Sequence, residues 1–337
     1  MDSSLPEKEE FALKASRRER FNNSLSTNRY LELKDARERL RQQLIAQGVI
    51  SDPVKRTSLA DAKPLVGTCA SMCPDFEREQ REYQNNLDKH ELIPGTRRAD
   101  PARAVKTFHR SAAGNEEPLP SDVRTPETLL GTLDYLVNVV IAGNQTLESC
   151  HGFVRDRTRS IRQDFTLQNI RDRSTIVAHE RIARFHIAAM HILCGNKDFA
   201  EHQDMEQLRK VLKTLIELYD DHRRLGVVCP NEAEFYAYYI ASHLRDSDAK
   251  RVAERLPGRI FTAPIVQQAL KLHRLSQTSN EIVSRQQPPN LFAALNLTTQ
   301  FFRAVSSDDT PLLLACLVEY EFPSIRRAGL KAMNMAF

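Results

Sequence analysis

Apolar residues recur at helical spacing from about residue 125 onward. Thr125 is placed to cap a helix whose first residue is Pro126. The apolar positions that follow are three or four residues apart, which gives one apolar face; they are Leu129, Leu130, Leu133, Leu136, Val137, Val140 and Ile141. Gly143 and Asn144 end the run. The pattern predicts a helix over residues 125–141.

Similar runs follow one another along the rest of the chain. They predict helices over residues 146–163, 174–194, 204–225 and 235–244, with further helix starts at Pro264, Asn290 and Thr310. Asn231 and Glu234 are three residues apart and form a capping pair that opens the helix at Phe235. No alternating run typical of a strand appears. The fold class is therefore all-α, and the number of helices favours an α-solenoid over a closed bundle.

The first 124 residues have a different pattern. Residues 1–28 are polar and aperiodic, which predicts disorder. Residues 29–64 read as a basic amphipathic helix that ends at Gly48, followed by a linker. Residues 65–124 carry repeated turn signals and read as an extended, motif-rich segment. Residues 125–337 form the predicted helical-repeat domain.

The composition is typical of a globular protein. The 337 residues are 41% hydrophobic and 27% charged, which suits a chain that buries its own core without disulfide bonds or structural metals. No apolar run approaches the ~20 residues of a membrane helix, and the first residues lack a secretory signal. We therefore expect no membrane insertion, and we expect the six cysteines to be reduced inside the cell.

The net charge of +4 is distributed unevenly. Basic residues concentrate in residues 14–63, 97–110 and 155–173. The last two clusters supply the candidate residues for contact with nucleic acid or an acidic partner: Arg97, Arg98, Arg103, Lys106, Arg110, Arg155, Arg157, Arg159, Arg162, Arg171 and Arg173. The alternative for any such cluster is a solvated helix face with local ion pairs.

Motifs for catalysis are absent from the sequence. It has no glycine-rich phosphate loop and no nucleophile elbow, so we expect neither an enzyme nor a bound cofactor. Cys69 and Cys73 lack the two further nearby ligands that a zinc site needs, and we expect them to have a packing or capping role. A metal-dependent enzyme that uses Cys69, Cys73 and a distant histidine is the remote alternative. The aromatic residues of the helix at 235–244 could stack on bases, but their spacing favours a buried ridge; they are Phe235, Tyr236, Tyr238 and Tyr239.

Several long motifs occur in a fixed order. They span residues 67–77 (GTCASMCPDFE), 100–108 (DPARAVKTF), 110–114 (RSAAG), 153–165 (FVRDRTRSIRQDF), 180–187 (ERIARFHI) and 231–235 (NEAEF). Together they resemble the SAC/GANP family, scaffold proteins of the nuclear complex that couples transcription to mRNA export. The resemblance covers about residues 65–337.

The resemblance implies a TPR/PCI-like helical repeat followed by a winged helix. It also implies pairing with a PCI-domain protein and a very small acidic subunit, RNA binding by the assembly, and a location in the nucleus at the nuclear envelope and its pores. The chain departs from the family pattern because it has no Phe-Gly dipeptide and because residues 325–337 read as the helix that leads into the winged helix, which is then truncated. The alternative is a scaffold subunit of another PCI-type assembly, either splicing-associated or similar to the proteasome lid.

Overall fold

The computed structural model describes residues 29–50, 64–110, 117–143, 146–246, 248–277 and 297–336. Every regular element in these ranges is helical, and the only β-type pairing in them is two isolated bridges. The all-α prediction is confirmed. The predicted disordered segment 1–28, most of the linker and the helix start at Asn290 lie outside the described residues.

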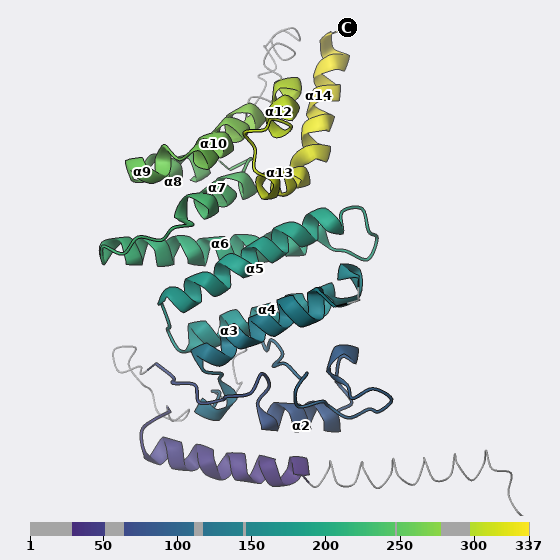
Figure 1. Ribbon diagram of the computed structural model, residues 1–337, viewed down its shortest axis with the longest axis vertical. Helices are drawn as coiled ribbons and strands as arrows, with labels where there is room; N and C mark the ends of the chain where they lie inside the picture. The colour runs from purple at the N-terminus through teal and green to yellow at the C-terminus, as the bar shows by residue number, and fades with distance from the viewer. Residues whose placement is uncertain are drawn as a thin grey trace, which may run out of the picture. The chain divides into compact units, whose positions relative to one another are not determined.

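The chain forms two compact units, Met1–Ser174 and Thr175–Phe337. The first unit begins with a helix over residues 29–46 and continues through shorter elements to a long helix (Figure 1). These elements are α2 (Asp75–Tyr83), the 3-10 turns η2 (Lys89–Glu91) and η3 (Pro120–Asp122), α3 (Pro126–Tyr135), η4 (Leu136–Ile141) and α4 (Leu147–Leu167).

The helix predicted from Thr125 forms with the predicted cap. The Thr125 hydroxyl accepts a hydrogen bond from the backbone N–H of Thr128 at 3.3 Å. After Tyr135 the backbone widens to π-helical bonding in η4, which the apolar pattern does not distinguish from an α-helix.

Aromatic and charged contacts hold the helix over residues 29–46 on the first unit. The Tyr30 ring stacks on Tyr83 with centroids 4.9 Å apart. Arg37 lies over the Phe76 ring at 4.7 Å and forms an ion pair with Asp122. Residues 29–46 thus form a helix, and Tyr30 and Arg37 are among the side chains that contact the rest of the unit.

The second unit consists of consecutive helices, coloured from teal to yellow in Figure 1. They are α5 (Arg173–Ile192), α6 (Glu201–Arg224), α7 (Glu232–Ser242), α8 (Asp248–Glu254), α9 (Gly258–Phe261), α10 (Pro264–Gln277), α12 (Thr298–Val305), α13 (Leu312–Val318), the 3-10 turn η5 (Glu319–Glu321) and α14 (Phe322–Ala336). Along the chain, α6 packs on α7, α7 on α10, α10 on α12 and α12 on α14. This stepwise packing is that of a degenerate helical repeat.

The aromatic helix α7 is a packing element. Phe235, Tyr236 and Tyr238 are each no more than 2% exposed, so the interpretation of a buried ridge is confirmed for these three, whereas Tyr239 is half-buried. The predicted capping pair is wrong. Asn231 instead donates from Nδ2 to Glu180 Oε2 at 2.7 Å, and Glu234 accepts from Arg184 at 2.7 Å.

The division between the units differs from the sequence-based segments. α3 and α4 belong to the first unit together with the segment over residues 65–124. The reason is a set of buried charges that joins that segment to α4. None of the described helices has the length and hydropathy that a bilayer crossing demands.

Candidate interaction surface

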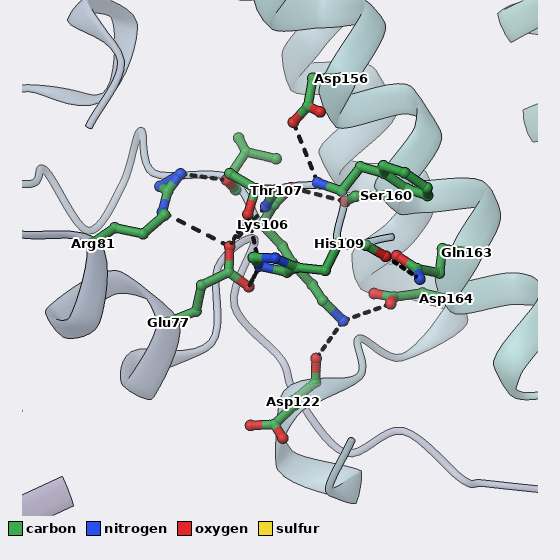
Figure 2. A network of polar contacts seen from close by, with 12 residues as sticks. Glu77, Arg81, Lys106, Thr107, His109, Asp122, Asp156, Ser160, Gln163 and Asp164 are labelled. Carbon is green, nitrogen blue, oxygen red and sulfur yellow. Dashed lines mark hydrogen bonds and ion pairs between the residues drawn. The ribbon is translucent and has the colours of Figure 1, made fainter. Parts of the chain in front are cut away.

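Residues 104–109 run in extended form between α2 and α4, and side chains of those helices bond to the backbone in place of a neighbouring strand (Figure 2). Each of four consecutive residues has a backbone group bonded in this way. The bonds run from Ser160 Oγ to Lys106 O (2.8 Å), from Thr107 N to Glu77 Oε1 (2.7 Å), from Phe108 N to Asp156 Oδ2 (3.2 Å) and from Gln163 Nε2 to His109 O (2.7 Å). The segment therefore stays extended without a sheet.

Glu91 of η2 is a fully buried carboxylate beside the start of this segment. Arg81 binds both of its oxygens, at 2.7 and 3.1 Å, and Arg157 of α4 donates to it at 2.9 Å. The Val105 amide donates to the same group at 2.9 Å. A buried carboxylate is tolerated only when donors surround it, so Glu91 fixes α2, the segment and α4 to one another.

Asp164 is the second fully buried carboxylate. Lys106 Nζ donates to Oδ1 at 2.6 Å, and Arg124 Nε donates to Oδ2 at 2.8 Å. Arg124 also donates to Ser160 Oγ at 2.7 Å. One α4 carboxylate thus pairs with a cation from each of two loop segments.

Glu77 lies at the edge of this network. Burial opposes its ionisation, but hydrogen bonds from His109 and Thr107, together with the charge of Arg81, outweigh burial and lower the pKa of Glu77 to about 2. The His109 ring lies 3.8 Å from Glu77, and this carboxylate raises the pKa of His109. Figure 2 shows the Glu77 carboxylate directed at Thr107 and at the His109 ring, both of the extended segment.

Gly67, the first residue of the first motif, lies where no side chain fits. A Cβ at this position would be 2.6 Å from the Val123 carbonyl oxygen and 2.8 Å from Gln168 Oε1. Its amide donates to Gln168 at 2.9 Å, and Gln168 in turn donates to the Arg124 carbonyl. The glycine therefore allows residues 67–69 to lie directly against residues 123–125.

Two of the predicted contact residues are buried inside this network. Lys106 is 6% exposed and Arg157 is 5% exposed, and both are bound to the carboxylates described above. The prediction that they contact nucleic acid or a partner is corrected for these two residues. Their role in the structure is to neutralise Asp164 and Glu91.

Six of the predicted residues are exposed; they are Arg97, Arg98, Arg103, Arg110, Arg171 and Arg173. Two of these make ion pairs within the unit. Arg98 lies 3.5 Å from Glu82, and Arg103 lies 4.0 Å from Asp100. Arg98 and Arg103 therefore fit the alternative interpretation, in which a basic cluster is a solvated surface with local ion pairs.

The remaining three, Arg155, Arg159 and Arg162, are half-buried and form a row on one face of α4. The Arg159 guanidinium lies 3.9 Å from the centre of the Phe108 ring. This contact joins the two basic clusters, through residues that are 51 positions apart in sequence. Burial and the like charge of Arg159 lower the pKa of Arg162 to about 10, which leaves it cationic at neutral pH. We define the arginine row as Arg155, Arg159 and Arg162.

Sequence reasoning did not find the carboxylates that organise the site. Glu77, Glu91 and Asp164 occur among ordinary charged residues, and no spacing marks them. One feature of the sequence does point to Glu77 and Asp164: they lie inside the motifs at residues 67–77 and 153–165, which also contain buried apolar residues. Such a mixture indicates charges that are paired inside the fold.

The cysteines of the first motif are packed. Cys73 is 1% exposed, and burial raises the pKa of its thiol well above the usual range. Cys69 pairs with Arg124 in an isolated parallel bridge through its backbone. Within the part of the chain that the structure describes, no three His, Cys, Asp or Glu side chains are grouped to hold a metal ion.

Known proteins match most of the chain. A profile of the SAC3/GANP family matches residues 72–337. SAC3 family protein 1 of Schizosaccharomyces pombe is 52% identical over 323 residues, which are 96% of this chain and 32% of that protein.

Two more distant relatives match 80% of this chain each. Protein xmas of Drosophila melanogaster is 34% identical over 280 residues, and SAC3 family protein B of Arabidopsis thaliana is 30% identical over 283 residues. The chain spans 13% and 16% of the length of these two proteins. All three curated relatives are therefore much longer than this chain.

Proposed function

Because the chain belongs to the SAC3/GANP family, we propose that it is a non-enzymatic scaffold subunit of a nuclear complex that couples transcription to mRNA export at the nuclear pore. The family match over residues 72–337 supports this, since it covers all of the second unit and the first unit from residue 72 onward. The chain spans about a third or less of the length of these relatives, so the partners named below are also proposals.

The proposed partners are a PCI-domain protein with a very small acidic subunit, and RNA. Stepwise packing of helices leaves one side of each helix for a partner, which is how helical repeats build extended binding surfaces. We place the complex in the nucleus, at the nuclear envelope and its pores.

The observation that carries the RNA contact is the arginine row beside Phe108. Guanidinium groups at helical spacing suit a chain of phosphates, because each can donate two hydrogen bonds to one phosphate. The exposed Arg110 follows Phe108 by two residues in the sequence, and we include it in the proposed surface. The proposed RNA surface therefore consists of the arginine row and Arg110.

Salt titration of RNA binding tests this proposal. Binding of a single-stranded oligonucleotide to the chain is measured by fluorescence anisotropy between 50 and 300 mM salt, with and without the PCI partner. We expect the logarithm of the association constant to fall linearly with the logarithm of salt concentration. No binding at low salt in either state would remove the phosphate role.

Identification of proteins that co-purify from nuclear extract tests the scaffold role. We expect the PCI partner and its small acidic subunit. Recovery of splicing-associated or proteasome-lid-like subunits in their place would assign the chain to another PCI-type assembly.

A further inference from the structure

His109 places an exposed aromatic ring beside the arginine row. Its backbone carbonyl accepts a hydrogen bond from Gln163 at 2.7 Å, and Gln163 is one helical turn from Arg159 on α4. His109 also directly follows Phe108, whose ring contacts Arg159. The residue therefore adjoins the proposed RNA surface both through its backbone and through its neighbour in the sequence.

The imidazole of His109 is held by one edge. Its Nε2 atom lies 2.9 Å from Thr107 Oγ1 and 3.8 Å from Glu77 Oε2 (Figure 2). Polar contacts to a ring nitrogen lie near the plane of the ring, so they orient the ring without covering its faces. The side chain is 66% exposed, and no ring among the described residues stacks on it. The structure thus presents an oriented imidazole with exposed faces.

The backbone that carries this ring is fixed as well. Side chains of α2 and α4 bond to backbone groups of residues 107, 108 and 109 in turn. A side chain on a segment that is already ordered loses less conformational freedom on binding than one on a free loop. The His109 ring is therefore preorganised for a ligand that lies flat against it.

The charge of the ring is already compensated inside the unit. A hydrogen bond to Glu77 raises the pKa of His109, and Glu77 itself is ionised because its pKa is lowered to about 2. The other charges that act on the ring are those of Lys106 and Asp156, which oppose each other. A ligand thus meets the face of the ring more than its charge.

An exposed ring face beside a row of guanidinium groups is suited to RNA. Bases stack on aromatic side chains, histidine among them, while nearby cations bind the phosphates of the same strand. An acidic side chain of a protein partner would have to compete with Glu77 for the polar edge of the ring. Bases inside a duplex are already stacked on one another, so their faces are not accessible to a side chain.

We propose that His109 stacks on a base of the bound RNA, and that the surface formed by the arginine row and Arg110 therefore selects single strands. This inference rests on the proposed RNA contact and deepens it, because a base contact is added to the phosphate contacts. Phosphate contacts alone do not distinguish a single strand from a duplex in this way.

Two forms of one strand test the selection. Fluorescein-labelled oligouridylate is titrated with the full chain, first as a single strand and then after annealing to oligoadenylate. The duplex carries the higher charge density, so phosphate contacts alone would favour it. We expect the single strand to bind at least fivefold more tightly. Equal or tighter binding of the duplex would overturn the inference.

Variants assign the base contact to His109. H109A should weaken binding of the single strand at least fivefold, which is about the smallest effect of losing one stacked base. Its salt slope should stay unchanged, because Glu77 compensates the charge of the ring. H109F keeps a ring face and should restore binding to within about twofold of the original chain. The matched control is H202A, at an exposed histidine of α6, which should bind as the original chain does. Circular dichroism checks that each variant is folded.

Three results with these variants would overturn the inference. These are unchanged binding by H109A, an equal loss in H109A and H109F, or a salt slope that falls by about 0.7 in H109A, which would make His109 a phosphate contact. Failure of the proposed function would look different: the original chain would bind neither the single strand nor the duplex at low salt.

Discussion

Lys106 Nζ lies 2.6 Å from Asp164 Oδ1, and both side chains are almost completely buried. Asp164 also binds Arg124, so one carboxylate pairs with two cations in the core of the first unit. The sequence predicts Lys106 as a surface contact residue, whereas the structure shows it buried in an ion pair. Removing either partner should therefore lower the free energy of unfolding.

Asp164→Ala should destabilise the first unit by about 3–5 kcal/mol, because it leaves two buried cations without their carboxylate. Lys106→Met should cost less, since Asp164 keeps Arg124. The measurement is urea unfolding followed by circular dichroism, because the chain has no tryptophan. Glu206→Ala is the control: its ion pair with Lys210 is exposed and should be worth less than about 1 kcal/mol. A similar loss for Asp164→Ala and Glu206→Ala would contradict the assignment.

The Glu77 carboxylate should make stability depend on acid pH. Folding lowers its pKa to about 2, so its contribution is fully present above the unfolded value of about 4.3 and is lost as the pH falls toward 2. The difference in unfolding free energy between the original chain and Glu77→Gln should shrink by about 3 kcal/mol over this range. Urea unfolding of both proteins from pH 5 to pH 2 measures it. A difference independent of pH would show that Glu77 is not held ionised.

His109 should act at higher pH and in the opposite direction. Folding raises its pKa, so its contribution is present below about pH 6.5 and is lost as the pH rises through the folded value. The His109→Ala variant should lack this dependence in unfolding experiments between pH 6 and pH 9. If the two proteins respond alike, the ring does not interact with Glu77 in solution.

R155Q/R159Q should weaken binding of single-stranded RNA and reduce the salt slope by about 1.4, the expected loss for two phosphate contacts. Lys106→Met is the informative comparison. Because Lys106 is buried, the folded variant should keep the slope of the original chain. R224Q, at an exposed arginine of α6, controls for net charge. Equal slopes for all four proteins would exclude the arginine row from the RNA surface.

Gly67→Ala should destabilise the chain by about 1–3 kcal/mol, because the added Cβ meets the Val123 carbonyl at 2.6 Å. Gly152→Ala is a matched control with the opposite expected sign. Gly152 is exposed within α4, and nothing lies within 4 Å of its added Cβ, so the change should stabilise the helix by up to about 1 kcal/mol. Thermal unfolding of the two variants compares them. Stabilisation by both would show that Gly67 is not tightly enclosed.

The helices were predictable because their ends carry local signals. Thr125 with Pro126 begins α3, and Gly195 and Gly226 adopt the positive φ angles of 80° and 74° that follow helices α5 and α6. The error at Asn231 has a physical cause: a capping pair is a local preference, and the distant Glu180 and Arg184 offered stronger charged partners.

The candidate site was predictable only in part. The sequence marks where arginines concentrate, but it does not show which of them meet a carboxylate from elsewhere in the chain. Arg157 and Arg159 are two residues apart on α4. One faces the buried Glu91 and the other covers Phe108, and only the fold separates these roles.

Residues 104–109 are bound by α2 and α4 through their backbone, much as a protein binds a peptide. Recognition through carbonyls and amides depends little on which side chains the segment itself carries, but it depends strictly on register. An inserted or deleted residue near Lys106 would displace every one of these bonds at once, whereas many substitutions at Thr107 or Phe108 would leave the backbone bonds intact. The rest of the first unit thus holds residues 104–109 through the kind of backbone contacts that hold a bound peptide, although these residues belong to the same chain.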